Sequence, residues 1–140
     1  MARSRAKAKG RRDYGRYFNA PHSVVTSPAF RALSAQATKL WVNLMTQYNG
    51  RNNGKIAAVH SQLQAFGWAR KSLERALREL QQAGFIDKTR QGGLGGGGRF
   101  CSYYRFTHLA TDDLPEVPVR KGPPTLEFHH WAPPEKKLCA

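Results

Sequence analysis

The side chains best suited to chemistry in this sequence form a row of cations and one amide. Lys71, Arg75, Arg78 and Gln82 recur at intervals of four, three and four residues. At about 100° per residue, this spacing places all four on one face of a helix. Guanidinium and ammonium groups are the side chains that bind phosphate, and arginine also pairs with guanine edges. The row therefore predicts an anionic partner.

The overall charge points to the same class of partner. The chain of 140 residues holds 23 Lys and Arg against 9 Asp and Glu, for a formal charge of +14 and a pI near 10.5. Such an excess usually meets nucleic acid or an anionic membrane surface. No apolar run of about 18 residues could span a bilayer, and no apolar stretch follows the basic N-terminus. We expect a cytoplasmic protein with no membrane association.

The cationic row must be held by a helix over residues 70–83. Apolar residues at helical spacing predict a buried face opposite the cations, and Gly84 is placed to end the helix in the left-handed conformation. They are Leu73, Ala76, Leu77, Leu80 and Ala83. The alternative interpretation is a solvated amphipathic face on which Glu74 and Glu79 pair with the arginines.

The start of this helix lacks a strong cap, because Ala69 has no side-chain acceptor. Its first amides, beside Arg70, Lys71 and Ser72, predict an anion-binding corner.

Helices and a short strand are predicted before this element. Ser27 followed by proline predicts a helix over Pro28–Leu33, and Ser34 caps a longer helix that runs to Tyr48. Pro21–Thr26 is a lead-in, and residues 55–58 favour a short strand. Arg51, Asn52 and Lys55 could touch phosphate, although the turn around them needs no ligand.

Residues 60–66 form a short helix with Leu63 and Phe66 facing inward. Gly67 and Trp68 then make a tight turn before the cationic helix, a helix-turn-helix arrangement. We expect Trp68 to be a core anchor, and the alternative is an indole that covers a sugar or base.

A hairpin is predicted after Gly84. Phe85–Ile86 opens a strand, a glycine-rich run over 92–98 makes a mobile tip, and Arg99–Phe106 returns as a second strand with Tyr104 and Phe106 in the core. The glycines formally match a dinucleotide fingerprint, but that motif must open a helix, and no Gly-Lys-Ser/Thr closes a phosphate-binding loop. The tip can instead approach a sugar-phosphate backbone closely.

No cofactor, metal or catalytic group is expected. His129, His130 and Cys139 fit no zinc spacing, and Cys101 and Cys139 are read as free thiols. Residues 1–20 form a disordered basic arm, which is either a solvated tail or an arm along DNA. Residues 110–140 form a proline-rich extended tail.

The segment Arg75–Leu80 through Gly84–Ile86, together with Tyr104–Thr107, resembles the recognition helix and wing of winged helix-turn-helix DNA-binding proteins. With Gln47–Gly54 it is similar to small helix-turn-helix proteins of prophages and other mobile elements. The resemblance covers about residues 22–109. It implies an α+β fold of three to four helices plus a small antiparallel wing sheet, over a domain of residues 21–109.

The resemblance implies a non-enzymatic protein that binds double-stranded DNA, as a transcription regulator or replication accessory of a phage or mobile element. The alternative is a phage-type interaction module that inhibits a host protein or ribonucleoprotein complex through its basic surfaces. The sequence does not decide whether the protein forms a homodimer, which would use the 35–48 helix or the tails. The implied DNA-binding residues, with Gln82 added from its place on the same helix face, are Arg70, Lys71, Ser72, Arg75, Arg78, Gln82, Arg90 and Arg99.

Overall fold

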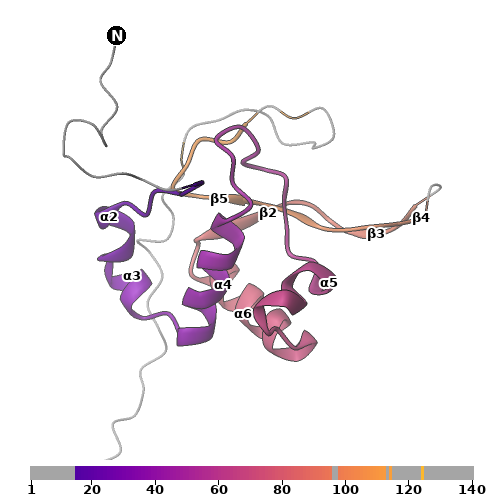
Figure 1. The fold of residues 1–140 in the computed structure, drawn as a ribbon, viewed down its shortest axis with the longest axis horizontal. Helices are drawn as coiled ribbons and strands as arrows, with labels where there is room; N and C mark the ends of the chain where they lie inside the picture. Colours follow the sequence, from indigo (N-terminus) through magenta and orange to yellow (C-terminus); the bar gives the residue numbers. More distant parts are fainter. Residues whose placement is uncertain (1–14, 96–97, 113, 115–123, 125–140) are drawn as a thin grey trace, which may run out of the picture.

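The computed structural model (Figure 1) describes residues 15–95, 98–112, 114 and 124. Within them the chain forms five α-helices, one 3-10 turn and five strands, so the predicted α+β class is confirmed. Most of the predicted basic arm and of the proline-rich tail lies outside the described residues. No helix in the described ranges is long and apolar enough to cross a membrane.

Three helices precede the sheet. They are α2 (His22–Val25), α3 (Pro28–Arg31) and α4 (Ala35–Met45). The two predicted serine caps are confirmed: Ser27 Oγ accepts from the Phe30 amide at 3.3 Å, and Ser34 Oγ accepts from the Ala37 amide at 3.1 Å. Each satisfies an amide that has no partner within its own helix.

Three predicted helix boundaries were wrong. One is the end of α3, which lies at Arg31 instead of Leu33. The expected lead-in contains α2, because Val24 and Val25 both donate backbone hydrogen bonds to the Pro21 carbonyl. The long helix ends at Met45 instead of Tyr48. There the Thr46 hydroxyl donates to the Asn43 carbonyl at 2.6 Å, a local bond that competes with continued helix.

The core lies between these helices, α6 (Arg70–Gln82) and one face of the sheet, and Figure 1 shows the helices below the strands. Aromatic rings meet there edge to face. The Phe30 centroid lies 5.3 Å from that of Trp41 and 5.5 Å from that of Phe85. Such pairs add about 0.5–1.5 kcal/mol to the area that the rings bury.

The sheet has three antiparallel strands in the order β1–β5–β2. They are β1 (Ile56–Ala57), β2 (Ile86–Arg90) and β5 (Tyr103–Phe106). Ile56 lies opposite Tyr104, and Ile86 lies opposite Phe106. Tyr104 and Phe106 are both buried, as their alternation along the strand predicted.

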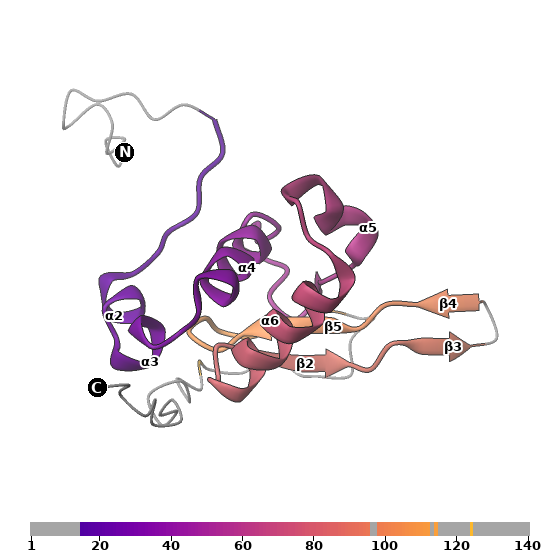
Figure 2. The ribbon, with the colours of Figure 1, turned by 90° about the horizontal axis from the view of Figure 1, so that it is seen from below.

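A separate two-stranded ribbon extends from this sheet. It consists of β3 (Gly93–Gly95) and β4 (Gly98–Phe100) and projects beyond the body in both views (Figures 1 and 2). The sequence predicted one continuous returning strand and a loop of glycines, and both expectations were wrong. The Ser102 hydroxyl accepts from the Gly92 amide at 2.8 Å, and the register shifts between Lys88 and Arg90. The returning strand is therefore divided, and glycines form part of the ribbon.

The buried Asn53 side chain joins the loop before β1 to the end of β5. Its amide nitrogen donates to the carbonyls of Phe106, Leu109 and Ala110, at 3.0, 3.3 and 2.9 Å. Its carbonyl oxygen accepts from the Phe106 amide at 2.7 Å. One side chain thus satisfies several backbone groups that the sheet leaves unpaired.

Packing extends past both ends of the predicted 21–109 domain. The Phe18 ring lies against Trp41, with centroids 6.5 Å apart. At the other end, Thr111 is buried, and the Asp112 carboxylate accepts from the backbone amide of Asn53 at 2.8 Å. The packed body therefore includes Phe18 at one end and Asp112 at the other.

His108 is buried beside Trp41 and Phe106, and among the described residues neither of its ring nitrogens has a hydrogen-bond partner. Burial lowers the pKa of this imidazole from 6.5 to about 4. Above pH 6.5 the ring is neutral in both folded and unfolded chains, so it has no effect on pH dependence there. Between pH 6.5 and 4 only the unfolded chain takes up the proton, and stability falls as the pH falls.

We expect this residue alone to lower the free energy of unfolding by up to about 3 kcal/mol between pH 6.5 and 4. Urea unfolding of the parent and of His108→Leu across this pH range measures the effect. The contributions of the other titrating groups cancel in the difference between the two unfolding free energies. A difference between the two proteins that does not change with pH would contradict the assignment.

Candidate nucleic-acid interface

Two helices joined by a tight turn carry the candidate surface. α5 (His60–Leu63) runs into a 3-10 turn (Gln64–Phe66), and Gly67 then adopts a φ of 89°, the left-handed conformation that glycine favours. Leu63 is buried as predicted, but Phe66 is 43 % exposed, so its inward placement was wrong. The 3-10 turn advances about 120° per residue and rotates Phe66 away from the core.

Trp68 fixes the turn between these helices. Its indole is buried and its Nε1 donates to Asn43 Oδ1 of α4 at 2.8 Å. The Trp68 carbonyl lies 2.9 Å from His60 Nε2, within hydrogen-bond distance. The expected role of Trp68 as a core anchor is confirmed, and the two polar contacts set where α6 begins.

The two faces of α6 separate as the sequence predicted. Leu73, Ala76 and Leu80 are buried against the body, and Leu77 is partly buried. Ser72 is half-buried. The predicted site residues of this helix other than Ser72 are all exposed, and they are Arg70, Lys71, Arg75, Arg78 and Gln82.

The acidic residues of the described chain mostly lie away from this cationic face. Glu79 Oε2 accepts from both the backbone amide and the hydroxyl of Ser34, at 3.2 and 2.7 Å. The expected alternative, in which Glu79 pairs with arginines along its own helix, is therefore replaced by a contact with α4. Glu74 is the only acid of α6 that stays exposed, against four exposed cations.

The start of α6 is uncapped, as expected. Ala69 precedes the helix with an extended backbone and forms no side-chain cap hydrogen bond. The first-turn amides of Arg70, Lys71 and Ser72 therefore meet no capping side chain, and the helix dipole makes this end favourable for an anion.

The two predicted wing residues lie on different parts of the hairpin. Arg90 sits at the base of the ribbon, half-buried, with Nη2 donating to the Cys101 carbonyl at 2.8 Å and its guanidinium 3.8 Å from the Tyr103 ring centroid. Arg90 therefore joins the ribbon to the sheet. Arg99 lies on β4 opposite Leu94 in the register of the ribbon.

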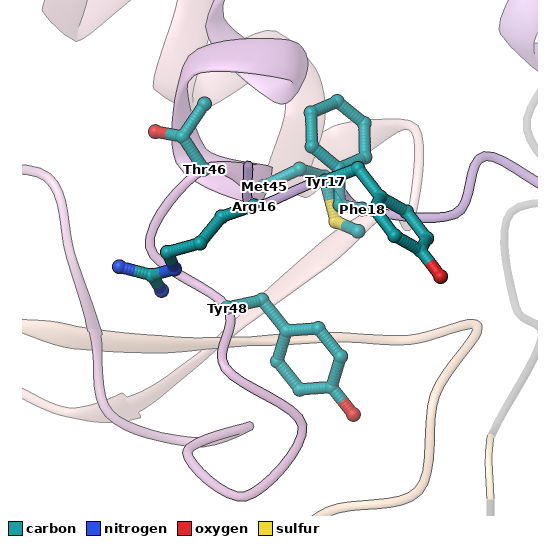
Figure 3. Close-up of a pocket in the computed structure, with 6 residues that line it drawn as sticks. All are labelled: Arg16, Tyr17, Phe18, Met45, Thr46 and Tyr48. Carbon is teal, nitrogen blue, oxygen red and sulfur yellow. The ribbon is translucent and has the colours of Figure 1, made fainter. Parts of the chain in front are cut away.

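A pocket of about 370 Å³ lies elsewhere, between the N-terminal segment and the end of α4 (Figure 3). Its walls contain none of the predicted site residues. Among the described residues, no group of three or more His, Cys, Asp or Glu side chains could hold a metal ion. His129, His130 and Cys139 lie outside the described ranges. The pocket is lined by Arg16, Tyr17, Phe18, Met45, Thr46 and Tyr48.

Sequence reasoning missed two residues that position the cationic helix. Asn43 supports the indole of Trp68 from beside the apolar stripe of α4, where the sequence pattern does not distinguish it from a solvent-facing residue. Glu79 holds the helix against Ser34, and no local pattern reveals a partner 45 positions away.

Comparison of the chain with models of known protein families, with curated proteins and with solved structures finds no match.

Proposed function

We propose that this protein binds double-stranded DNA without catalysing a reaction, through a winged helix-turn-helix fold with α6 as the recognition helix. The observation that carries the proposal is the exposed surface of α6, which holds four cations and one acid. A face with this excess of positive charge favours a polyanion.

Two further features support a duplex as that polyanion. An α-helix fits the major groove, which is about 12 Å wide. A tight turn before α6 and a projecting ribbon after it are compatible with a helix that lies in this groove while the ribbon reaches the neighbouring surface (Figure 2).

Within this proposal the exposed residues have different roles. Arg75 and Arg78, in the middle of α6, read guanine edges through paired hydrogen bonds. Arg70, Lys71 and Ser72 contact phosphate at the start of the helix and fix its register. The chain then acts as a transcription regulator or replication accessory of a phage or mobile element.

The salt dependence of duplex binding tests the electrostatic part of the proposal. If about six phosphates are neutralised, the association constant should fall with a log–log slope near −5. Fluorescence anisotropy with a labelled duplex between 50 and 200 mM salt, roughly the range where such slopes are measured, gives this value. A slope near zero would rule out binding through phosphate contacts.

Selection of bound duplexes from a random pool tests sequence preference. A recovered motif supports base reading by α6, and its symmetry gives the number of copies bound.

Pull-down from cell extract before and after nuclease treatment tests the rival class of function. A protein partner retained after nuclease, with no duplex motif recovered, would favour an interaction module instead.

A further inference from the structure

The ribbon of β3 and β4 carries a side chain that the body does not use. Leu94 is the only residue of β3 that is not glycine, and it is 80 % exposed. Of the large apolar side chains that the structure describes, it is the most exposed. A leucine on a projecting ribbon contributes nothing to the core of the described residues, and its side chain is open to contact with a partner.

The glycine beside it points to the same conclusion. Gly93 has no left-handed φ, and a Cβ atom added there would meet no atom within 4 Å. Neither backbone conformation nor internal packing therefore requires glycine at this position. Glycine in a strand weakens it and often marks a place where a ligand approaches the backbone closely.

The dimensions of such a ribbon fit one groove of DNA. Paired strands lie about 4.8 Å apart, whereas a sheet with its side chains is about 10 Å thick. The minor groove is about 6 Å wide, so it admits the glycine positions of the ribbon more readily than residues with large side chains. Apolar side chains that enter this groove separate base steps and bend the duplex.

We propose that Leu94 is an apolar wedge that enters the minor groove next to the major groove occupied by α6, and that it bends the duplex there. This inference rests on the proposed DNA-binding function. Both views show the ribbon projecting on the side of the body where α5 lies (Figures 1 and 2). Arg99 lies opposite Leu94 in the ribbon, and an arginine is the residue type that a narrow minor groove attracts.

The test measures affinity and bending on the same molecule. The probe is a duplex of about 30 base pairs that contains the selected motif and carries one dye at each end. Energy transfer reports the end-to-end distance, and anisotropy reports the dissociation constant. With the full parent chain we expect a bend of at least about 20°.

Two variants separate the wedge from folding effects. Leu94→Ala should straighten the duplex and weaken binding roughly tenfold, since the bend no longer brings extra surface into contact. Gly93→Val should cause the same losses while its melting temperature stays equal or rises, because valine favours strands. Val42→Ala removes another exposed apolar side chain, on α4, and should change neither quantity.

The outcomes distinguish this inference from the function on which it rests. A parent chain that binds no duplex removes the proposed function. A parent that binds with steep salt dependence but leaves the duplex straight, or a Leu94→Ala variant that bends it fully, overturns the wedge and leaves the function standing. A Leu94→Ala variant that loses self-association instead of bending also overturns it.

Discussion

Replacing Arg75 and Arg78 together with alanine is expected to weaken binding to the preferred duplex about 100-fold and to abolish the preference among sequences. A well-formed paired contact between arginine and guanine discriminates by about 1–3 kcal/mol, and 1.4 kcal/mol corresponds to a factor of ten. Both side chains are exposed on α6, so the melting temperature should not change. Anisotropy titrations against the selected and a scrambled duplex measure both effects.

A matched variant removes the same charge from another surface. Arg16 and Arg31 are also exposed, but they lie before and within α3 instead of on α6. The Arg16→Ala/Arg31→Ala double variant should lose only a few-fold in affinity and keep its sequence preference, because general electrostatic attraction is all that it weakens. Equal losses in the two double variants would mean that α6 does not read bases.

The largest effect on stability is expected at Asn53. Asn53→Ala leaves the buried amide of Phe106 without a partner and removes a donor that three carbonyls share. Each orphaned buried group costs about 1–3 kcal/mol, so we expect a loss of roughly 3–5 kcal/mol. Urea unfolding followed by circular dichroism measures the change.

Two neighbouring substitutions make this prediction specific. Asn53→Asp keeps the size and one acceptor oxygen, but it sets a carboxylate against three carbonyls and should be at least as destabilising as alanine. Asn52→Ala also removes an amide from the same loop. That side chain is only partly buried, so the loss should stay near 1 kcal/mol. Similar losses at both positions would argue against a special role for Asn53.

The helices were largely predictable because their signals are local. Ser27 and Ser34 cap the helices that follow them, and the period of apolar residues in α6 identifies its buried face without knowledge of its neighbours. The division of the hairpin was not predictable. It depends on the bond between Gly92 and Ser102, which forms only when two distant segments are already paired.

In the candidate site, too, local features were predictable from the sequence and tertiary contacts were not. The exposure of Arg75 and Arg78 follows from helix geometry alone, whereas the position of Arg90 depends on Tyr103 and the Cys101 carbonyl across the sheet. The sequence offered Glu79 as a partner for arginines on its own helix, whereas in the structure its carboxylate accepts a hydrogen bond from the Ser34 hydroxyl.

Most carboxylates of the described residues take part in contacts within the scaffold. Of the four acids in the described residues, Glu79, Asp87 and Asp112 are hydrogen-bonded to Ser34, Arg105 and Asn53. The exposed surface of α6 is left with Glu74 as its one exposed acid beside four exposed cations. Substituting Glu79, Asp87 or Asp112 with its amide would therefore alter contacts inside the scaffold and leave the charges on the exposed surface of α6 unchanged.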